Sequence, residues 1–231
     1  RIDYIVEDSN CKVLLDEEEL ELFKLQRSRY SKANQPINLL PSNLMYCIYT
    51  SGSTGNPKGV LIEYSQILNT ISSQKNIFSI LENDKCLQFS SFSFDASVSE
   101  LFTSFLSGST LYLLSNTIRF DITLLTDFIL FNQISILTLP PSILRLIDFS
   151  KLNQIKSLIS AGENIGDVNF KELSNKTSLI NAYGPTETSI CATSYSVRNK
   201  TNSVLTIPIG RPIQNTEVYV LDKHHQLVPY G

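Results

Sequence analysis

Residues 50–59 concentrate the kinds of group that bind phosphate. The run consists of Thr50, Ser51, Gly52, Ser53, Thr54, Gly55, Asn56, Pro57, Lys58 and Gly59. Glycine lets backbone N–H groups approach an anion, hydroxyls add hydrogen-bond donors, and lysine supplies positive charge. The run lacks the P-loop pattern, in which Ser or Thr follows Gly-Lys directly. We expect a loop that binds a polyphosphate; the alternative is an ordinary mobile surface loop.

A second polar run, residues 181–188, also contains residue types that can bind a ligand. It consists of Asn181, Ala182, Tyr183, Gly184, Pro185, Thr186, Glu187 and Thr188. An asparagine amide can read the edge of a nucleobase, and a tyrosine ring can stack on it. The threonine can donate to a phosphate, and the glutamate can hold Mg²⁺. The alternative is a polar turn with a packed tyrosine.

Asp95 lies between aromatic residues, just before a predicted helix. Aspartate commonly caps a helix N-terminus, and in isolation a cap is the favoured interpretation. The functional alternative is a carboxylate that pairs with a substrate ammonium group.

The elements that must position these residues alternate between strands and helices. We expect strands over residues 11–15, 44–49, 60–62, 85–89, 110–114, 134–139, 155–159, 178–180, 192–197 and 217–221. Helices are expected from residue 16 and over 64–75, 97–106, 120–131, 141–147 and 167–173, with a connection over 26–43. This alternation predicts a mostly parallel sheet covered on both faces, with ligands beyond the carboxyl ends of its strands.

Composition indicates an ordinary globular chain. It has 231 residues, 42% of them hydrophobic, and a net charge of −3. We therefore expect no nucleic-acid partner and no membrane association. The four cysteines are far apart in sequence, which favours reduced thiols and a cytoplasmic location over a zinc site or redox pair.

Residues 50–59 and 181–188 together resemble the signature motifs of the adenylate-forming superfamily. That group includes acyl-CoA synthetases, luciferases and the adenylation domains of nonribosomal peptide synthetases. Residues 160–163 resemble the family segment that lies along the adenine, where Gly162 would permit close approach. Glu163 is equally well explained as a solvated carboxylate. An aspartate at the position of Asp95 is typical of amino-acid-activating members, so the chain resembles a peptide-synthetase adenylation domain.

The resemblance implies ATP and Mg²⁺ as cofactors, with Glu187 as the metal ligand. The implied nucleotide-binding residues are Thr50, Ser51, Gly52, Ser53, Thr54, Gly55, Lys58, Gly162, Asn181, Ala182, Tyr183, Gly184 and Thr186. Catalytic contributions fall to Thr50, Lys58 and Glu187.

The resemblance also identifies a predicted side-chain pocket. It comprises Asp95, Ala96, Ser99, Thr138, Ile159, Ala161, Ala182, Ile190 and Cys191. The spacings match those of phenylalanine-activating members, which carry tryptophan where this chain has Ser99. Small residues leave depth and apolar residues form walls, so we expect an aromatic substrate with a para substituent, either tyrosine or a para-ether.

The fold that the resemblance implies is α/β, with two flavodoxin-like parallel sheets flanked by helices. We expect the first α/β subdomain over residues 1–80, the second over 81–192, and the start of a β-barrel over 193–231. The C-terminal subdomain with the family's catalytic lysine is expected to be missing, so this piece alone should be inactive.

The implied activity is formation of an aminoacyl adenylate from an amino acid and ATP. The aminoacyl group would then pass to phosphopantetheine on a carrier domain, with other synthetase domains as further partners. Two alternatives stay open: the core of an acyl- or aryl-CoA ligase, and a fragment that binds nucleotide without performing chemistry.

Overall fold

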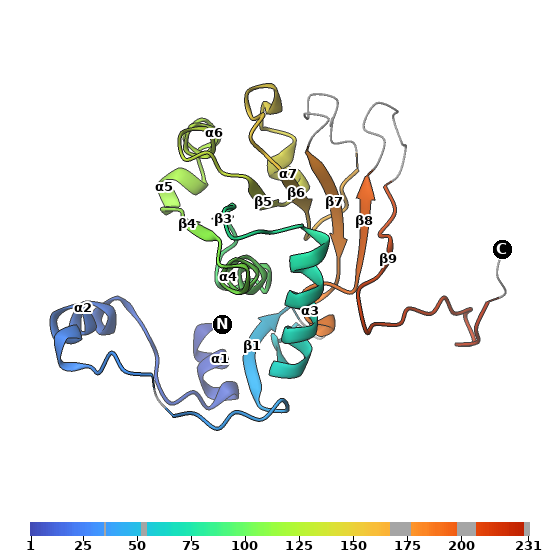
Figure 1. Ribbon diagram of the computed structural model, residues 1–231. Helices are drawn as coiled ribbons and strands as arrows, with labels where there is room; N and C mark the ends of the chain where they lie inside the picture. Colours follow the sequence, from blue (N-terminus) through green and yellow to red (C-terminus); the bar gives the residue numbers. More distant parts are fainter. Residues whose placement is uncertain (35, 52–54, 167–176, 198–206, 229–231) are drawn as a thin grey trace. The chain divides into compact units, whose positions relative to one another are not determined.

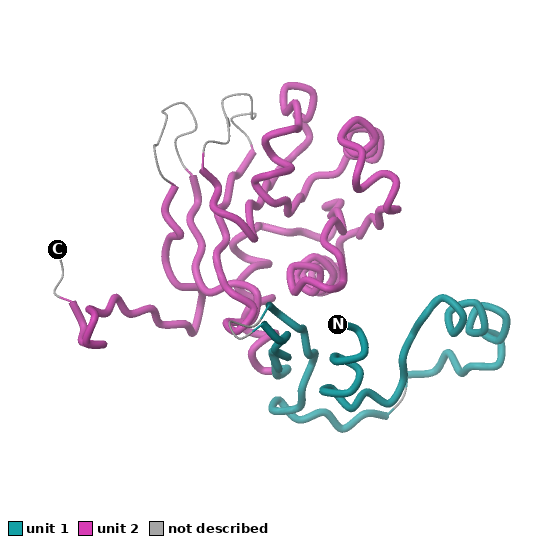
Figure 2. Tube along the Cα trace, turned by 180° about the vertical axis from the view of Figure 1, so that it is seen from behind, with its two compact units in different colours: residues 1–64 teal, residues 65–231 magenta. Residues whose placement is uncertain are grey.

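The computed structural model describes residues 1–34, 36–51, 55–166, 177–197 and 207–228. The chain divides into two compact units, residues 1–64 and residues 65–231 (Figure 2). The expected domain boundaries at residues 80 and 192 stay predictions.

The first unit begins with two helices, α1 (Ile2–Ser9) and α2 (Glu17–Gln26). The expected helix start at Asp16 is confirmed, because the Asp16 carboxylate accepts a hydrogen bond of 2.9 Å from the Glu19 amide. The expected strand over residues 11–15 is wrong: these residues are exposed and irregular. A short apolar run needs a neighbouring strand to complete its hydrogen bonds, and the structure places none beside it in the described part of this unit.

The described strands of the first unit are β1 (Leu44–Thr50) and β2 (Lys58–Glu63). They confirm the strands expected around residues 50–59. They pair antiparallel, whereas the sequence analysis expected a parallel sheet in this region. The short connection explains the difference, because parallel neighbours need a crossover of a dozen or more residues.

The second unit contains a seven-stranded sheet in the order β4-β3-β5-β6-β7-β8-β9 (Figure 1). The strands are β3 (Lys85–Gln88), β4 (Thr110–Leu113), β5 (Ile136–Leu139), β6 (Ser157–Ser160), β7 (Ser178–Tyr183), β8 (Thr193–Val197) and β9 (Arg211–Pro212). Strands β4, β3, β5, β6 and β7 run parallel, and β8 and β9 add to the edge in antiparallel pairing. The predicted α/β class with a mostly parallel sheet is confirmed.

The helices are α3 (Tyr64–Ile77), α4 (Ala96–Ser107), α5 (Asn116–Arg119), α6 (Ile122–Phe131) and α7 (Pro141–Leu144). Local chemistry sets several of their ends. The Asp121 carboxylate accepts from the Leu124 amide at 3.0 Å at the start of α6. Gly108 ends α4 with a φ of 68°, a conformation that glycine adopts without strain.

Successive side chains along each strand point to opposite faces of the sheet, and each face has its own hydrophobic core. Leu137, Leu139, Leu158 and Leu179 pack with buried residues of α6 and α7. The intervening Cys86, Ile136, Ile159, Ile180 and Ala182 belong to the other core, with Phe78 and Ile80 that follow α3. Because successive strand residues point to opposite faces, each parallel strand contributes to both cores, as expected for a covered parallel sheet.

Two expected elements differ from the structure, and a third cannot be compared. Helix α7 ends at Leu144 rather than residue 147, because the chain turns to bury Ile147 and Phe149 in the core. Residues 217–221 form no strand but a single bridge between Leu221 and Leu227. The helix expected over 167–173 lies outside the described residues. No described helix is both long enough and apolar enough to cross a membrane.

Candidate active site

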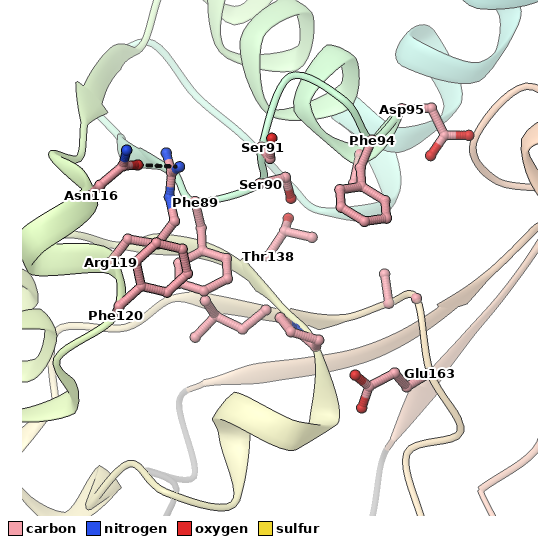
Figure 3. Close-up of a pocket in the computed structure, with 15 residues that line it drawn as sticks. Phe89, Ser90, Ser91, Phe94, Asp95, Asn116, Arg119, Phe120, Thr138 and Glu163 are labelled. Atoms are coloured by element: carbon pink, nitrogen blue, oxygen red, sulfur yellow. Dashed lines mark hydrogen bonds between the residues drawn. The ribbon is translucent and has the colours of Figure 1, made fainter. Parts of the chain in front are cut away.

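A cavity of about 600 Å³ lies at the carboxyl ends of β3, β5 and β6 (Figure 3). Parallel pairing brings the ends of these strands to one edge of the sheet, which is where the sequence analysis expected ligands to bind. The cavity is lined by Phe89, Ser90, Ser91, Phe94, Asp95, Ala96, Asn116, Arg119, Phe120, Thr138, Leu139, Pro140, Ala161, Gly162 and Glu163. It thus brings together Asp95, Ala96, Thr138 and Ala161 from the predicted side-chain pocket and Gly162 from the predicted nucleotide site.

Asp95 directly precedes α4, but its side chain makes no capping hydrogen bond. Its Oδ2 is buried and has no hydrogen-bond partner among the described residues. Burial raises the pKa of the carboxyl group, a hydrogen bond from Thr186 opposes that rise, and the nearby Glu187 adds to it. A half-buried carboxylate with an unpartnered oxygen is therefore available for a cationic ligand in the cavity.

Glu100 of α4 holds the loop that follows β3. Its carboxylate accepts from the amides of Phe89 and Ser90 at 3.0 Å each and from the Ser90 hydroxyl at 3.0 Å. Burial raises the pKa of Glu100 to about 7, although these hydrogen bonds and the charge of Arg119 lower it. Sequence analysis assigned Glu100 no role. A lone glutamate in a helix gives no signal that the loop of another strand will bond to it.

Arg119 and aromatic rings form one end of the cavity, and carboxylates form the other (Figure 3). The Arg119 guanidinium donates to Asn116 Oδ1 at 3.1 Å, and Phe89 and Phe120 line the cavity with it. Glu163 accepts from the amide and hydroxyl of Ser142, at 3.1 and 2.9 Å, so it is not merely a solvated carboxylate. The Arg119 end of the cavity was not predicted from the sequence, because no helix was expected at α5.

The rest of the predicted side-chain pocket does not line this cavity: Ser99, Ile159, Ala182 and Cys191 are buried, and Ile190 is partly buried. Ile159, Ala182 and Cys191 lie together in the core on the face of α3, with Ala161 packed against them. Ser99 of α4 is also buried and donates to Gln74 Oε1 of α3 at 2.7 Å. Gln74 was missed by the sequence analysis, because no local motif marks a buried helix glutamine as a partner of these residues.

Residues 181–188 divide between the sheet and the surface. Asn181 is buried, and its amide donates to the Pro208 carbonyl at 2.8 Å, which uses one of the two protons on the nitrogen. Tyr183 ends β7 with its ring half exposed. Glu187 and Cys191 line a second cavity of about 480 Å³, with polar residues of α3 and of residues 213–216. No group of three His, Cys, Asp or Glu side chains that could hold a metal occurs among the described residues.

The backbone is strained where the predicted pocket wall begins. Ser189 and Ile190 both have positive φ, 62° and 75°. This region is unfavourable for side chains that branch at Cβ, so the isoleucine is an outlier. The conformation turns the chain sharply between the 181–188 motif and β8.

Gly184 makes that turn possible through close packing. A Cβ at this position would lie 2.7 Å from Cys191 Cα and from the Ile190 carbonyl oxygen. Both contacts are with backbone, which cannot move aside as a flexible side chain would. Gly184 therefore fixes the spacing between the 181–188 motif and the Ile190–Cys191 wall.

The predicted phosphate loop belongs to the first unit. Thr50 ends β1 and Lys58 begins β2, and the two are directly paired across the hairpin. Paired residues of an antiparallel ladder project on the same face, so the hydroxyl and the ammonium group lie on one side. Ser51 and Gly55 are exposed, and Gly55 has a φ of 93°. Gly52, Ser53 and Thr54 lie outside the described residues.

Comparison with known families shows that residues 1–231 match the model of the family described as AMP-binding enzyme. Tyrocidine synthase 1 of Brevibacillus parabrevis is 37% identical and gramicidin S synthase 1 of Brevibacillus brevis 36% identical, each over 100% of this chain. The chain spans 22% of the length of each relative.

Solved structures show the same fold. The Vibrio cholerae adenylation domain AlmE in complex with glycyl-adenosine-5'-phosphate has a TM-score of 0.71 at 22% identity, over 98% of this chain and 43% of that one. The Klebsiella oxytoca NpsA N-terminal subdomain, in complex with 3-hydroxyanthranilyl-AMSN, has a TM-score of 0.71 at 23% identity, over 87% and 53%.

We expect Gly184→Ala to destabilise the protein by about 1–3 kcal/mol, because the added methyl group must displace backbone atoms. Gly59→Ala is the matched control, since the three atoms nearest to its new Cβ, at 3.0 to 3.4 Å, belong to the side chains of Cys47 and Tyr49. Urea unfolding measures both effects. Equal losses in the two variants would contradict the assigned role of Gly184.

We expect Glu100 to make stability depend on pH. Its pKa in the folded state, about 7, exceeds its ordinary value of 4.5, so the folded state binds the proton more tightly than the unfolded state. This contribution is complete below pH 4.5 and is lost as pH rises through 7, on the order of 3 kcal/mol in all. Glu100→Gln should remove this part of the pH dependence in urea unfolding measured from pH 5 to 8. Identical slopes for wild type and variant would show that the carboxyl group is already ionised throughout this range.

Proposed function

This chain belongs to the AMP-binding enzyme family, and from that premise we propose that it is the core of an adenylation domain of a nonribosomal peptide synthetase. In this proposal it activates an amino acid with ATP, giving an aminoacyl adenylate and pyrophosphate. Similarity to tyrocidine synthase 1 and gramicidin S synthase 1 along the whole chain supports the assignment.

The observation that carries the proposal is the state of Asp95. It lines the cavity at the carboxyl ends of the strands, caps no helix, and keeps a buried Oδ2 without a partner. An α-ammonium group would supply that partner and relieve the cost of burying an unpaired carboxylate. A carboxylic acid substrate without an amine would leave this cost in place.

Residues in each of the two units have the chemistry to bind part of a nucleotide. At Gly162 a Cβ would meet nothing within 4 Å, so the chain leaves open space where a flat base could approach the backbone. Tyr183 exposes about half of its ring, which suits stacking. Thr50 and Lys58, on one face of their hairpin, would hold phosphates, and Glu187 would hold Mg²⁺. The bound metal would neutralise phosphate charge during the displacement.

The chain's own residues would contribute mainly position and electrostatics. Asp95 would orient the amino acid by its ammonium group, so that the carboxylate is directed at the α-phosphorus. Thr50 and Lys58 would stabilise the charge that develops on the phosphates. In the complete protein, the aminoacyl group would then pass to a phosphopantetheine thiol on a carrier domain, in a cytoplasmic assembly with other synthetase domains.

We assign an aromatic amino acid as the substrate. Ala161 and Ala182 are small, and Ile159 and Cys191 supply apolar surface around them. Ser99 is a small, buried residue of α4, and the family resemblance assigns it to the same pocket, where a larger side chain would reduce the depth. A ring with a para substituent would fill such a pocket and gain dispersion contacts.

We predict that Asp95→Ala raises the KM for the amino acid about a hundredfold or more and leaves ATP affinity unchanged. The substrate ammonium would be buried without its partner, at a cost of roughly 3–5 kcal/mol. Asp95→Asn should lose nearly as much, because it keeps the shape and removes the charge. Thermal melts serve as the control. If Asp95 were only a helix cap, both variants would melt at lower temperature and keep normal substrate affinity, and this outcome would contradict the proposal.

The reaction itself is tested by ATP–pyrophosphate exchange across amino acids and their des-amino acids. The full-length natural protein is used, because this chain spans 22% of its relatives and we propose that it makes little adenylate alone. We expect tyrosine to exceed phenylalanine and leucine, and Ser99→Trp to shift the preference toward phenylalanine by filling the depth.

Exchange with aryl or acyl acids but not with amino acids would instead indicate a CoA ligase. ATP binding without exchange would indicate a binding module. A wild type that prefers leucine, or an aromatic ranking that Ser99→Trp leaves unchanged, would contradict the aromatic assignment.

A further inference from the structure

The carboxylate of Glu100 is surrounded by hydrogen-bond donors from β3 and the loop that follows it. Glu100 is 4% exposed and lies on α4. Its oxygens accept from the Phe89 amide, from the amide and hydroxyl of Ser90 and, at 3.4 Å, from the side-chain nitrogen of Gln88. A carboxylate is an acceptor only, so its two oxygens can satisfy all these donors together. A neutral amide in its place would offer one acceptor oxygen and turn its own N–H groups toward other donors.

Ser90 is held by each of its polar groups. Its amide and hydroxyl donate to Glu100, and its carbonyl accepts from the side-chain amide of Gln88. The Gln88 oxygen in turn accepts from Arg119 at 3.4 Å. Ser90 lines the cavity, as do Phe89 and Arg119. Glu100 therefore fixes the first residues of a loop that forms one wall of the cavity.

The backbone between Ser90 and Asp95 has little freedom. The Phe94 amide donates to the Ser91 carbonyl at 2.9 Å, which closes a turn. The Phe94 carbonyl accepts from the amide and the hydroxyl of Ser97, at 3.1 and 2.7 Å. Asp95 follows this turn directly, so its place at the cavity is set by a turn that begins beside Ser90 and by a helix start that Ser97 holds.

We propose that Glu100 is a positioning residue that acts through Asp95: its carboxylate closes residues 90–100 into a ring and thereby fixes Asp95 for the ammonium group of the amino acid. Glu100 is not among the residues that line the cavity, so this role requires no contact with substrate. The inference rests on the proposed function and deepens it, because it adds a residue on which the affinity for the amino acid depends.

The expected effect follows from preorganisation. A carboxylate that is already ordered before the substrate arrives binds more tightly than a mobile one. We expect Glu100→Gln to raise the KM for the amino acid about tenfold, because the loop that leads to Asp95 loses its acceptor. The KM for ATP should change by less than about twofold, since the side-chain hydrogen bonds described for Glu100 go to none of the residues assigned to the nucleotide.

The test measures pyrophosphate exchange on the full-length protein for wild type, Glu100→Gln, Asp95→Ala and the double variant, with the amino acid that exchanges fastest in wild type. The assay is run at pH 8, above the Glu100 pKa of about 7, so that the wild-type carboxyl group is ionised. If Glu100 acts through Asp95, Glu100→Gln should change kcat/KM by less than about twofold once residue 95 is alanine. Effects that multiply would show that Glu100 acts elsewhere and would overturn the inference.

Thr103→Val is the matched control. Thr103 lies on the same helix, is 3% exposed, and donates its hydroxyl to the Ser99 carbonyl at 2.6 Å. The substitution removes a buried hydrogen bond within α4 and leaves the bonds to the β3 loop in place. It should keep both KM values at the wild-type level. Thermal melts of all variants show that they are folded in the assay, and equal rises of KM in the two single variants would assign the effect to the helix and overturn the inference.

Hydrogen exchange read by mass spectrometry tests the ring itself. In wild type, a peptide that contains residues 89–95 should exchange slowly, because the amides of Phe89 and Ser90 donate to a buried carboxylate. Glu100→Gln should speed exchange in this peptide about tenfold, since each lost hydrogen bond lowers the free energy of local opening. Thr103→Val should leave it unchanged. Equal exchange in wild type and Glu100→Gln would overturn the inference.

The inference and the proposed function fail in different ways. A Glu100→Gln protein with an unchanged KM for the amino acid would overturn the inference and leave the proposed function standing. Absence of exchange with every amino acid would overturn the proposed function and, with it, this inference.

Discussion

Parallel pairing of neighbouring strands determines which parts of this chain can meet. In β5, β6 and β7 the pairing runs from Ile136 with Ser157 and from Ser157 with Ser178, so the three strands advance together toward one edge. Every loop that leaves a carboxyl end must then emerge at that edge. Residues far apart in the sequence, such as Asp95, Thr138 and Gly162, line one cavity for this reason.

The helices on the α3 and α4 face then supply buried polar groups around that edge. Glu100 ties the loop after β3 to α4, and Gln74 connects α3 to Ser99 of α4. Such groups are costly to bury unless they are bonded, so each restricts the positions that its partners can take. Asp95 differs, because one of its oxygens has no partner in the described protein. The site thus combines polar contacts that hold its walls with an Asp95 carboxylate oxygen that has no partner among the described residues.

Much of this architecture could be predicted from the sequence, and the exceptions have physical causes. Strands such as Ile136–Leu139 are mostly apolar and lie between turn residues, so local pattern is sufficient to predict them. Residues 11–15 have the same pattern but no strand beside them. Whether a short apolar run becomes a strand depends on a partner that the run itself does not encode.

The site residues also fall into two groups, those that could be predicted from the sequence and those that could not. Asp95, Thr138 and Ala161 could be predicted because the family resemblance matches them to a side-chain pocket, and the structure places all three at one cavity. Gln74, Glu100 and Arg119 could not, because their importance arises from contacts between helices and loops that tertiary packing creates. The predicted role of Asn181 at a nucleobase stays a prediction; its amide nitrogen donates one hydrogen bond to the Pro208 carbonyl, a partner that the sequence does not reveal.

The positive φ of Ile190 has a consequence for how this pocket could diverge. An isoleucine at φ 75° stores conformational free energy, on the order of 1–3 kcal/mol, that glycine or asparagine would release. Substitutions at residue 190 are therefore constrained in two ways, by the shape of the predicted pocket wall and by the backbone conformation. A library randomised at residue 190 and sorted by abundance would enrich small or polar replacements whatever their substrate. Only a sort that reads activity per folded molecule would separate a changed specificity from a relaxed turn.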